Sequence, residues 1–555
     1  MRTIIRQREP AVEARRGGAR RLELNFFRPE KIPLGVKVTR NVIYSGVRLF
    51  LLAPLPFFVI PFFLKKLGTS GYGTWAVFVA ASGITSVADL GLVTTLSKHV
   101  AEFYTLKDFR SLDRLISTGV VLYFGLACLL SVILWVSSQL LIAFLFRGSP
   151  VSVQELEILW RYLILLIFAS TLTMLLSSVV IGLQRMDLST GINSLNLLSS
   201  AGLSVLFLGW NWGLRGVLYG YVLAAWVTLF AYAFTVRRLL PEIRLSLAAC
   251  RWSVAKEIFS FSVQTYVSQV AVVIHNQIEK IYLARFAGVV FVGWYDISGD
   301  LALKLRGIPS LVLAPIMPAA SELHALSDQG RLSQLYYRTH RYLALIAVPL
   351  AAYIVFVARE FVQLWVGPSL SVIAVPLSVL VIVNFINLTT GPGLLILVGG
   401  GKLRPGLHSA IFGIVLNVTL SLFLIRAYGF QGAVTGTSIS IVAGSVFFLY
   451  LFRRETGRAY PKVIRTAYLK PIACSLGSIA ILWILTRSER SSWTNLTVNC
   501  IVFGVVYIAL LLLLRFFDSS DLAMVERFLP IPQIARRIIP NAELGSSLLS
   551  DSESA

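Results

Sequence analysis

Residues 65–114 read KKLGTSGYGTWAVFVAASGITSVADLGLVTTLSKHVAEFYTLKDFRSLDR. A basic, glycine-rich turn opens an apolar run of helix length, and a charged connector begins at Glu102. The same plan returns in residues 285–334 without a gap. The matching positions are Gly68 and Gly288, Gly73 and Gly293, Glu102 and Glu322, Asp108 and Asp328, and Leu112 and Leu332. A repeat of this length indicates an architectural duplication, and in an apolar protein it is typical of transporters built from two related halves.

Composition places the chain in a membrane. Of its 555 residues, 56% are hydrophobic and only 14% are charged, and the mean hydropathy is +0.76. A soluble domain is typically about 25% charged. The formal net charge of +23 resides in tails and in loops between apolar runs, which favours a topological signal over nucleic-acid binding. The cysteines form no CxxC pair, and we find no Walker A or HExxH motif, so no metal site or ATPase is indicated.

Apolar runs of about 20 residues predict an all-α polytopic protein with about fourteen transmembrane helices. The predicted spans are 41–63, 74–97, 115–146, 158–181, 190–210, 214–236, 258–283, 290–319, 335–357, 370–398, 406–426, 431–452, 468–486 and 496–516.

The distribution of basic residues predicts the orientation. With the N-terminus inside, most of the 50 Lys and Arg residues fall in inner loops and tails, so both termini are expected in the cytoplasm. The predicted units are a basic N-terminal tail (1–40), a first six-helix bundle (41–236), a linker (237–257), a second six-helix bundle (258–452), a linker (453–467), a terminal helix pair (468–516) and a C-terminal tail (517–555). Six spans return the chain to the same side, so the two repeats are expected to be parallel, with a pseudo-two-fold axis along the membrane normal.

The segments GTSGYGTW (68–75), ADLGL (88–92) and KHVAE (98–102), with the glycine-containing loops that follow, resemble polysaccharide exporters of the multidrug/oligosaccharidyl-lipid/polysaccharide superfamily. The resemblance covers about residues 38–516. It implies two six-helix bundles in a V around a central cavity, with two further helices. It also implies a non-enzymatic flippase of the bacterial inner membrane, which moves an undecaprenyl-pyrophosphate-linked glycan for the biosynthesis of O-antigen, as in lipopolysaccharide, or of exopolysaccharide.

The expected partners are the lipid-linked glycan, membrane lipid and other polysaccharide assembly proteins, without nucleic acid. No cofactor is expected, and Na⁺ or H⁺ is the expected coupling ion. The alternatives are a cation-coupled multidrug exporter, whose cavity should hold acids that meet cationic drugs, and a membrane glycosyltransferase.

Charges inside apolar helices mark candidate functional residues because a charge at membrane depth needs a partner or a cavity. Arg48 in the first span either binds the pyrophosphate or pairs with Asp89 in the second. In the eighth span, Asp296, Asp300 and Lys304 share one helix face, and Asp300 and Lys304 are spaced to pair within the helix. Arg306 is turned nearly opposite to Lys304, towards either another surface or the inner headgroups.

The seventh span is unusually polar and is expected to line the cavity. Glu279 and Lys280 are adjacent, so they should face different surroundings, and interfacial snorkelling accounts for Lys280 as well as function does. The predicted substrate-binding residues are Arg48, Gln264, Asn276, Gln277, Lys280, Lys304 and Arg306. The predicted residues for ion coupling or charge pairing are Asp89, Glu279, Asp296 and Asp300.

Trp75, Trp294 and Tyr295 lie near the outer ends of the second and eighth spans. Tryptophan and tyrosine gather at membrane interfaces, where one end of the ring system is apolar and the other is hydrated. We therefore interpret these three side chains as an interfacial belt, with sugar stacking as the alternative.

Overall fold

The computed structural model describes residues 52, 54–83, 92–147, 149–241, 243, 277–457, 463–486 and 492–517. In this part of the chain all regular structure is helical. Ten helical segments are long and apolar enough to cross a membrane. One of them, the 53-residue α16 (Arg404–Thr456), contains two predicted spans on either side of Gly429, where the backbone leaves helical geometry. Likewise α2 (Leu55–Ser82) bends at Gly68 and joins the end of the first predicted span to the second.

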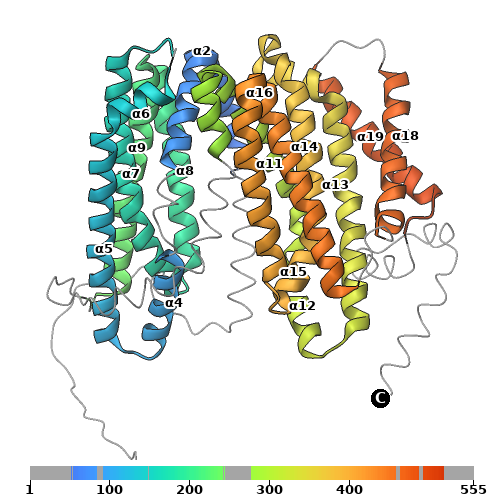
Figure 1. Cartoon of the computed structure of the whole chain (residues 1–555), viewed down its shortest axis with the longest axis horizontal. Coiled ribbons are helices and arrows are strands. Elements are labelled where there is room, and N and C mark those ends of the chain that lie inside the picture. The colour runs from blue at the N-terminus through green and yellow to red at the C-terminus, as the bar shows by residue number, and fades with distance from the viewer. Residues whose placement is uncertain are drawn as a thin grey trace, which may run out of the picture.

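Two groups of helices stand side by side in Figure 1. We call the described residues 54–241 the first lobe and residues 277–457 the second lobe. Besides α2, the helices of the first lobe are α4 (Leu92–Thr105), α5 (Phe109–Val136), α6 (Ser138–Leu145), α7 (Val153–Gly182), α8 (Met186–Gly209) and α9 (Gly213–Leu239). Besides α16, those of the second lobe are α11 (Val289–Ser310), η3 (Leu311–Leu313), α12 (Ile316–Ala325), α13 (Gln329–Val366), η4 (Pro368–Ile373), α14 (Ala374–Leu388) and α15 (Gly391–Gly399).

A third, smaller unit packs against the outside of the second lobe (Figure 1). It consists of η5 (Ile464–Tyr468), α18 (Leu469–Leu485) and α19 (Trp493–Leu513), and its contacts are made mainly with α13. The Tyr353 hydroxyl donates to the Leu496 carbonyl at 2.6 Å, and the Tyr507 hydroxyl donates to the Leu345 carbonyl at 3.1 Å. The Trp493 ring at the start of α19 also contacts Phe57 of α2, with ring centroids 5.7 Å apart, so this unit touches the first lobe there and packs mainly against the second lobe.

The internal repeat is visible in the backbone. Gly68 and Gly288 have φ values of 69° and 110°, and Lys107 and Ser327 both have φ of 57°. Asp108 and Asp328 each cap the next helix by accepting from a backbone N–H, of Ser111 at 3.0 Å and of Arg331 at 2.8 Å. Matching turns with matching caps confirm the duplication predicted from the sequence.

The two repeats run in the same direction. The turns from α4 to α5 and from α12 to α13 lie at the same end of the molecule (Figure 1). In the first of these turns, hydrogen bonds with Ser111 lower the pKa of the Asp108 carboxyl. This end carries the charged connectors that the sequence predicts on the inner side.

The lobes share one hydrophobic core at the opposite end. The largest buried cluster joins residues of α2, α7 and α9 to residues of α11, α13 and α14. Phe57 stacks on Trp365 with ring centroids 5.4 Å apart, and the Trp365 indole N–H donates to the Phe57 carbonyl at 2.7 Å. At the end of the connectors, the first and second lobes have separate core clusters. Among the described residues, these core clusters join the lobes at one end and are separate at the other, as expected for a V.

The interpretation of Trp75, Trp294 and Tyr295 as an interfacial belt is wrong. The Trp75 ring packs against Phe63 and Tyr72, and the Trp294 ring packs against Phe291 and Phe430. Tyr295 is buried, and its hydroxyl is hydrogen-bonded to the Thr437 hydroxyl at 2.8 Å. The rings fill the core where the lobes meet because the helices that carry them pack on each other there.

Candidate functional site

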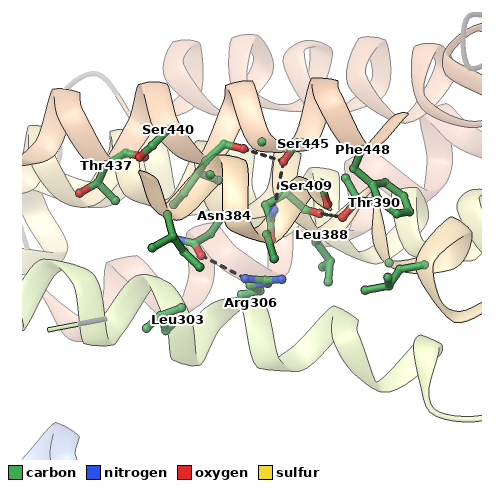
Figure 2. A pocket seen from close by; sticks show the side chains of 18 of the residues that line it. Leu303, Arg306, Asn384, Leu388, Thr390, Ser409, Thr437, Ser440, Ser445 and Phe448 are labelled. Atoms are coloured by element: carbon green, nitrogen blue, oxygen red, sulfur yellow. Dashed lines mark hydrogen bonds between the residues drawn. The ribbon is translucent and has the colours of Figure 1, made fainter. Parts of the chain in front are cut away.

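A cavity of about 1140 Å³ lies in the second lobe. Its walls come from residues 277–280, α11, α14, α15 and α16. Apolar atoms make up most of the lining surface, and charged, amide and hydroxyl groups face the same space (Figure 2). An apolar cavity with a few convergent polar groups is the usual form of a binding site for a small molecule.

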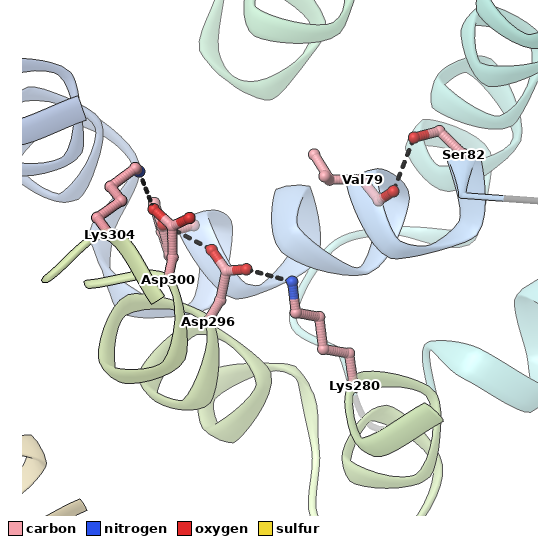
Figure 3. Close-up of polar contacts among 7 residues, drawn as sticks. Val79, Ser82, Lys280, Asp296, Asp300 and Lys304 are labelled. Atoms are coloured by element: carbon pink, nitrogen blue, oxygen red, sulfur yellow. Dashed lines mark hydrogen bonds and ion pairs between the residues drawn. The ribbon is translucent and has the colours of Figure 1, made fainter. Parts of the chain in front are cut away.

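The polar face of α11 is oriented as the sequence predicts. Asp300 and Lys304, one helical turn apart, form an ion pair within the helix (Figure 3). Asp296 and Asp300 line the cavity, whereas Lys304 does not. The neighbouring carboxylate therefore already neutralises the Lys304 ammonium group.

Asp296 connects three segments of the chain. The Lys280 ammonium donates to Asp296 Oδ1 at 2.5 Å, and the Tyr72 hydroxyl of α2 donates to Asp296 Oδ2 at 2.8 Å. The Lys280 and Asp296 side chains are only 14% and 12% exposed. Lys280 therefore makes a buried ion pair, so the snorkelling alternative is wrong. Because Tyr72 belongs to the first lobe, its hydrogen bond crosses the interface between the lobes.

Glu279 occupies separate surroundings, as expected for the neighbour of Lys280 on a helix. Its side chain is 1% exposed. Glu279 Oε1 accepts hydrogen bonds from the Asn417 amide at 2.7 Å and from the Thr437 hydroxyl at 2.9 Å, both on α16. The Asn417 amide also donates to the Ser440 hydroxyl at 3.1 Å. Neutral groups thus hold a buried acid in contact with two segments of α16.

Arg306 points into the cavity. The alternative that Arg306 reaches the lipid headgroups of the inner leaflet is therefore wrong. Its Nη1 lies 3.5 Å from the amide oxygen of Asn384 (Figure 2). The Asn384 amide nitrogen donates to the Leu380 carbonyl at 2.9 Å, which fixes the oxygen towards Arg306. Within the described ranges, no carboxylate forms an ion pair with Arg306. Its guanidinium is the cation of the cavity most available to an anionic ligand.

Several predicted site residues lie outside the part of the chain that the structure describes: Arg48, Asp89, Gln264 and Asn276. Of the others, Gln277, Lys280, Asp296, Asp300 and Arg306 line the cavity. Gln277 also lies against Gly83 of the first lobe, since a Cβ on that glycine would be 3.3 Å from Gln277 Cγ.

Sequence reasoning missed a group of polar side chains on α2, α14 and α16. They lie in predominantly apolar or mixed segments, and polar positions within spans are themselves a signal of an interior-facing group. The missed residues are Tyr72, Asn384, Asn387, Asn417, Thr437, Ser440 and Ser445.

Comparison with known proteins agrees with this architecture. The family model described as "Polysaccharide biosynthesis protein" matches residues 38–324. A putative O-antigen transporter of Shigella flexneri is 21% identical over 71% of this chain and 92% of its own length. A probable low-salt glycan biosynthesis flippase of Haloferax volcanii is 21% identical over 88% of this chain and 99% of its own length. The lipid II flippase MurJ, in an inward closed conformation, has the same fold with a TM-score of 0.68, 14% identity, and coverage of 84% of this chain and 98% of MurJ.

Proposed function

The chain belongs to the polysaccharide biosynthesis protein family, and from this membership we propose that it is a membrane flippase for lipid-linked glycans. The proposed substrate is an oligosaccharide or polysaccharide repeat unit on undecaprenyl pyrophosphate. The relatives named as an O-antigen transporter and as a glycan biosynthesis flippase support a transporter rather than an enzyme.

Arg306 is the observation that carries the proposal. A guanidinium with only an amide oxygen as its partner in the described residues is suited to a phosphate, which it can bind through two parallel hydrogen bonds. Lys280 and Lys304 each have a carboxylate partner, so they contribute less to binding an anion. The aliphatic lining provides surroundings in which this single electrostatic contact is strong.

The same ion pairs argue against a multidrug exporter for cationic compounds. Such a cavity needs carboxylates that are available to the drug. Asp296 accepts from Lys280 and Tyr72, and Asp300 is paired with Lys304. The acids of this cavity are therefore already neutralised by bases of the same chain.

Transport is proposed to follow alternating access. The lobes share a core at one end and have separate cores at the other. A rocking motion of the lobes can therefore close the end that is open and open the end that is joined. We place the joined end on the outer side of the bacterial inner membrane and both termini in the cytoplasm. This orientation rests on the distribution of basic residues in the loops.

Glu279 is the proposed coupling acid. It is buried against neutral donors, and the Oδ1 atom of Asn417 makes no hydrogen bond within the described part of the chain. A carboxylate and an amide oxygen are suitable ligands for a small hard cation, and the carboxylate can also take up a proton. We propose that occupation of this group by Na⁺ or H⁺ accompanies the change between the two states.

The test uses purified protein in liposomes and a fluorescent glycan on a polyprenyl pyrophosphate. Arg306→Gln should reduce flipping by at least about tenfold, because it removes the charge that balances the phosphate. Arg161→Gln is the matched control. Arg161 lies on α7, and its guanidinium carbon is 5.7 Å from the centre of the Trp135 ring rather than in the cavity. Equal flipping by wild type and Arg306→Gln would contradict the proposed role, and absence of flipping by the wild type would contradict the function.

A further inference from the structure

Amide and hydroxyl groups from α14 and α16 face the cavity together with Arg306 (Figure 2). The Asn387 amide donates to the Ser445 hydroxyl at 3.0 Å. Asn384 holds Arg306, and the Thr390 and Ser409 hydroxyls also lie in the lining. These groups are neutral. The Thr390, Ser409 and Ser445 hydroxyls donate to backbone carbonyls of their own segments, so their oxygens remain as acceptors for the hydroxyls of a sugar.

The charges of the cavity leave little attraction for more than one anionic group. Its charged lining residues are Lys280, Asp296, Asp300 and Arg306. Lys280 is paired with Asp296, and Asp300 is paired with Lys304, which is not in the lining (Figure 3). Of the two cations in the described lining, Lys280 has a carboxylate partner and Arg306 has none. A second anion in this space would meet ion pairs whose cations already have a carboxylate partner.

The space itself exceeds the needs of a phosphate. A volume of about 1140 Å³ lies above the usual range for drug-sized ligands, about 300–1,000 Å³. Gly299 is in the lining between the two aspartates, and no atom lies within 4 Å of the position that a Cβ would occupy there. The cavity therefore has room for a larger group beside the anion held by Arg306.

We propose that this cavity binds the sugar unit that neighbours the phosphate of the substrate, and that it selects a sugar without a carboxylate. Sugar hydroxyls both donate and accept, so they match the amides and hydroxyls of α14 and α16. A uronic acid at the same place would bury its carboxylate beside the Lys280–Asp296 and Lys304–Asp300 ion pairs, without a free cation to receive it. This inference rests on the proposed function and specifies the substrate class of the same site.

The experiment measures binding of three probes to the full-length protein in lipid nanodiscs. The probes are a short polyprenyl pyrophosphate, the same lipid carrying glucose, and the same lipid carrying glucuronate. Glucose and glucuronate differ only where a hydroxymethyl group is replaced by a carboxylate. We expect the glucose probe to bind at least about tenfold more tightly than the glucuronate probe, because no free cation compensates the desolvation of the second charge. It should also bind more tightly than the lipid without sugar.

Two variants test the residues. Asn387→Leu should abolish the advantage of the glucose probe over the sugar-free lipid. Asp300→Asn removes the ion-pair partner of Lys304. The unpaired Lys304 ammonium group should then reduce the preference for the glucose probe over the glucuronate probe. Thr389→Val is the control, since Thr389 is a neighbouring polar residue outside the lining.

Equal affinity for the glucose and glucuronate probes, with binding that still requires Arg306, would overturn the inference and leave the flippase function standing. Wild-type protein that binds none of the three probes would overturn both.

Discussion

Gly73 of α2 and Gly293 of α11, which occupy equivalent positions in the two repeats, pack directly against each other where the lobes meet. A Cβ on Gly293 would lie 3.1 Å from Gly73 Cα, and a Cβ on Gly73 would lie 1.8 Å from the Val289 carbonyl oxygen. The two helices approach this closely because neither has a side chain at the crossing. The two halves therefore meet at a pair of equivalent glycines.

Gly73→Ala should prevent the lobes from closing at this end. The added methyl group would overlap the Val289 carbonyl, which belongs to a helix backbone and cannot turn away. We expect at least about a tenfold loss of glycan export per inserted molecule, since about 1.4 kcal/mol against the closed state suffices for that change. Gly125→Ala, where nothing lies within 4 Å of the new atom, is the control. Full export by Gly73→Ala would show that this contact is not needed.

Lys280→Met should destabilise the protein by leaving Asp296 charged and without its ion-pair partner. Removal of one member of a buried ion pair costs about 3–5 kcal/mol. The double variant Lys280→Met with Asp296→Asn should recover most of the loss in thermal stability, measured in detergent. Tyr72→Phe removes only one hydrogen bond to Asp296 and should cost about 1 kcal/mol. Additive effects of the Lys280 and Asp296 changes would argue against the pair.

Glu279→Gln should uncouple transport from its driving ion. The amide oxygen of glutamine still accepts from Asn417 and Thr437, so the fold should persist, while the negative charge is lost. Flipping in liposomes is measured with an imposed Na⁺ or pH gradient and without one. We expect the gradient to accelerate the wild type and to have little effect on the variant. An unchanged response to both gradients in Glu279→Gln would assign coupling to another acid.

Gly299→Leu should block the cavity without disturbing helix packing. The new side chain would extend from an open position in the lining, and leucine is a better helix former than glycine. Gly307→Leu is a matched control on the same helix, because its Cβ position is equally open but lies outside the lining. We expect normal abundance for both variants and a loss of more than about tenfold in flipping for Gly299→Leu alone. Equal flipping by the two variants would separate the cavity from the transport path.

Reporter fusions can test the parallel repeat in the membrane. Fusions after Lys107 and after Ser327 should report the same side, since both residues occupy the equivalent turn of their repeats. A fusion after Asn211 should report the opposite side. Asn211 follows α8, and this single span separates it from the turn at Arg185. If Lys107 and Ser327 report opposite sides, the repeats are inverted.

The sequence alone determined the features that depend on local chemistry and on periodicity. Apolar run length predicts membrane helices, and the repeat of Gly68 as Gly288 and Asp108 as Asp328 predicts the duplication that the backbone confirms. The pairing of Asp300 with Lys304 also followed from their spacing of one helical turn, since both residues lie on one helix.

Only the tertiary structure decided which distant residues meet. Glu279 and Asn417 are 138 positions apart, and the side of α16 that faces residues 277–280 depends on how the helices are rotated against each other. The same rotation pairs Lys280 with Asp296, turns Arg306 towards Asn384, and buries Tyr295 in the core instead of at the membrane interface. Hydropathy is nearly uniform around such helices, so the sequence fixes their length and order but carries little signal for their rotation. Close contacts between helices, such as the crossing of the Gly73 and Gly293 backbones, set that rotation.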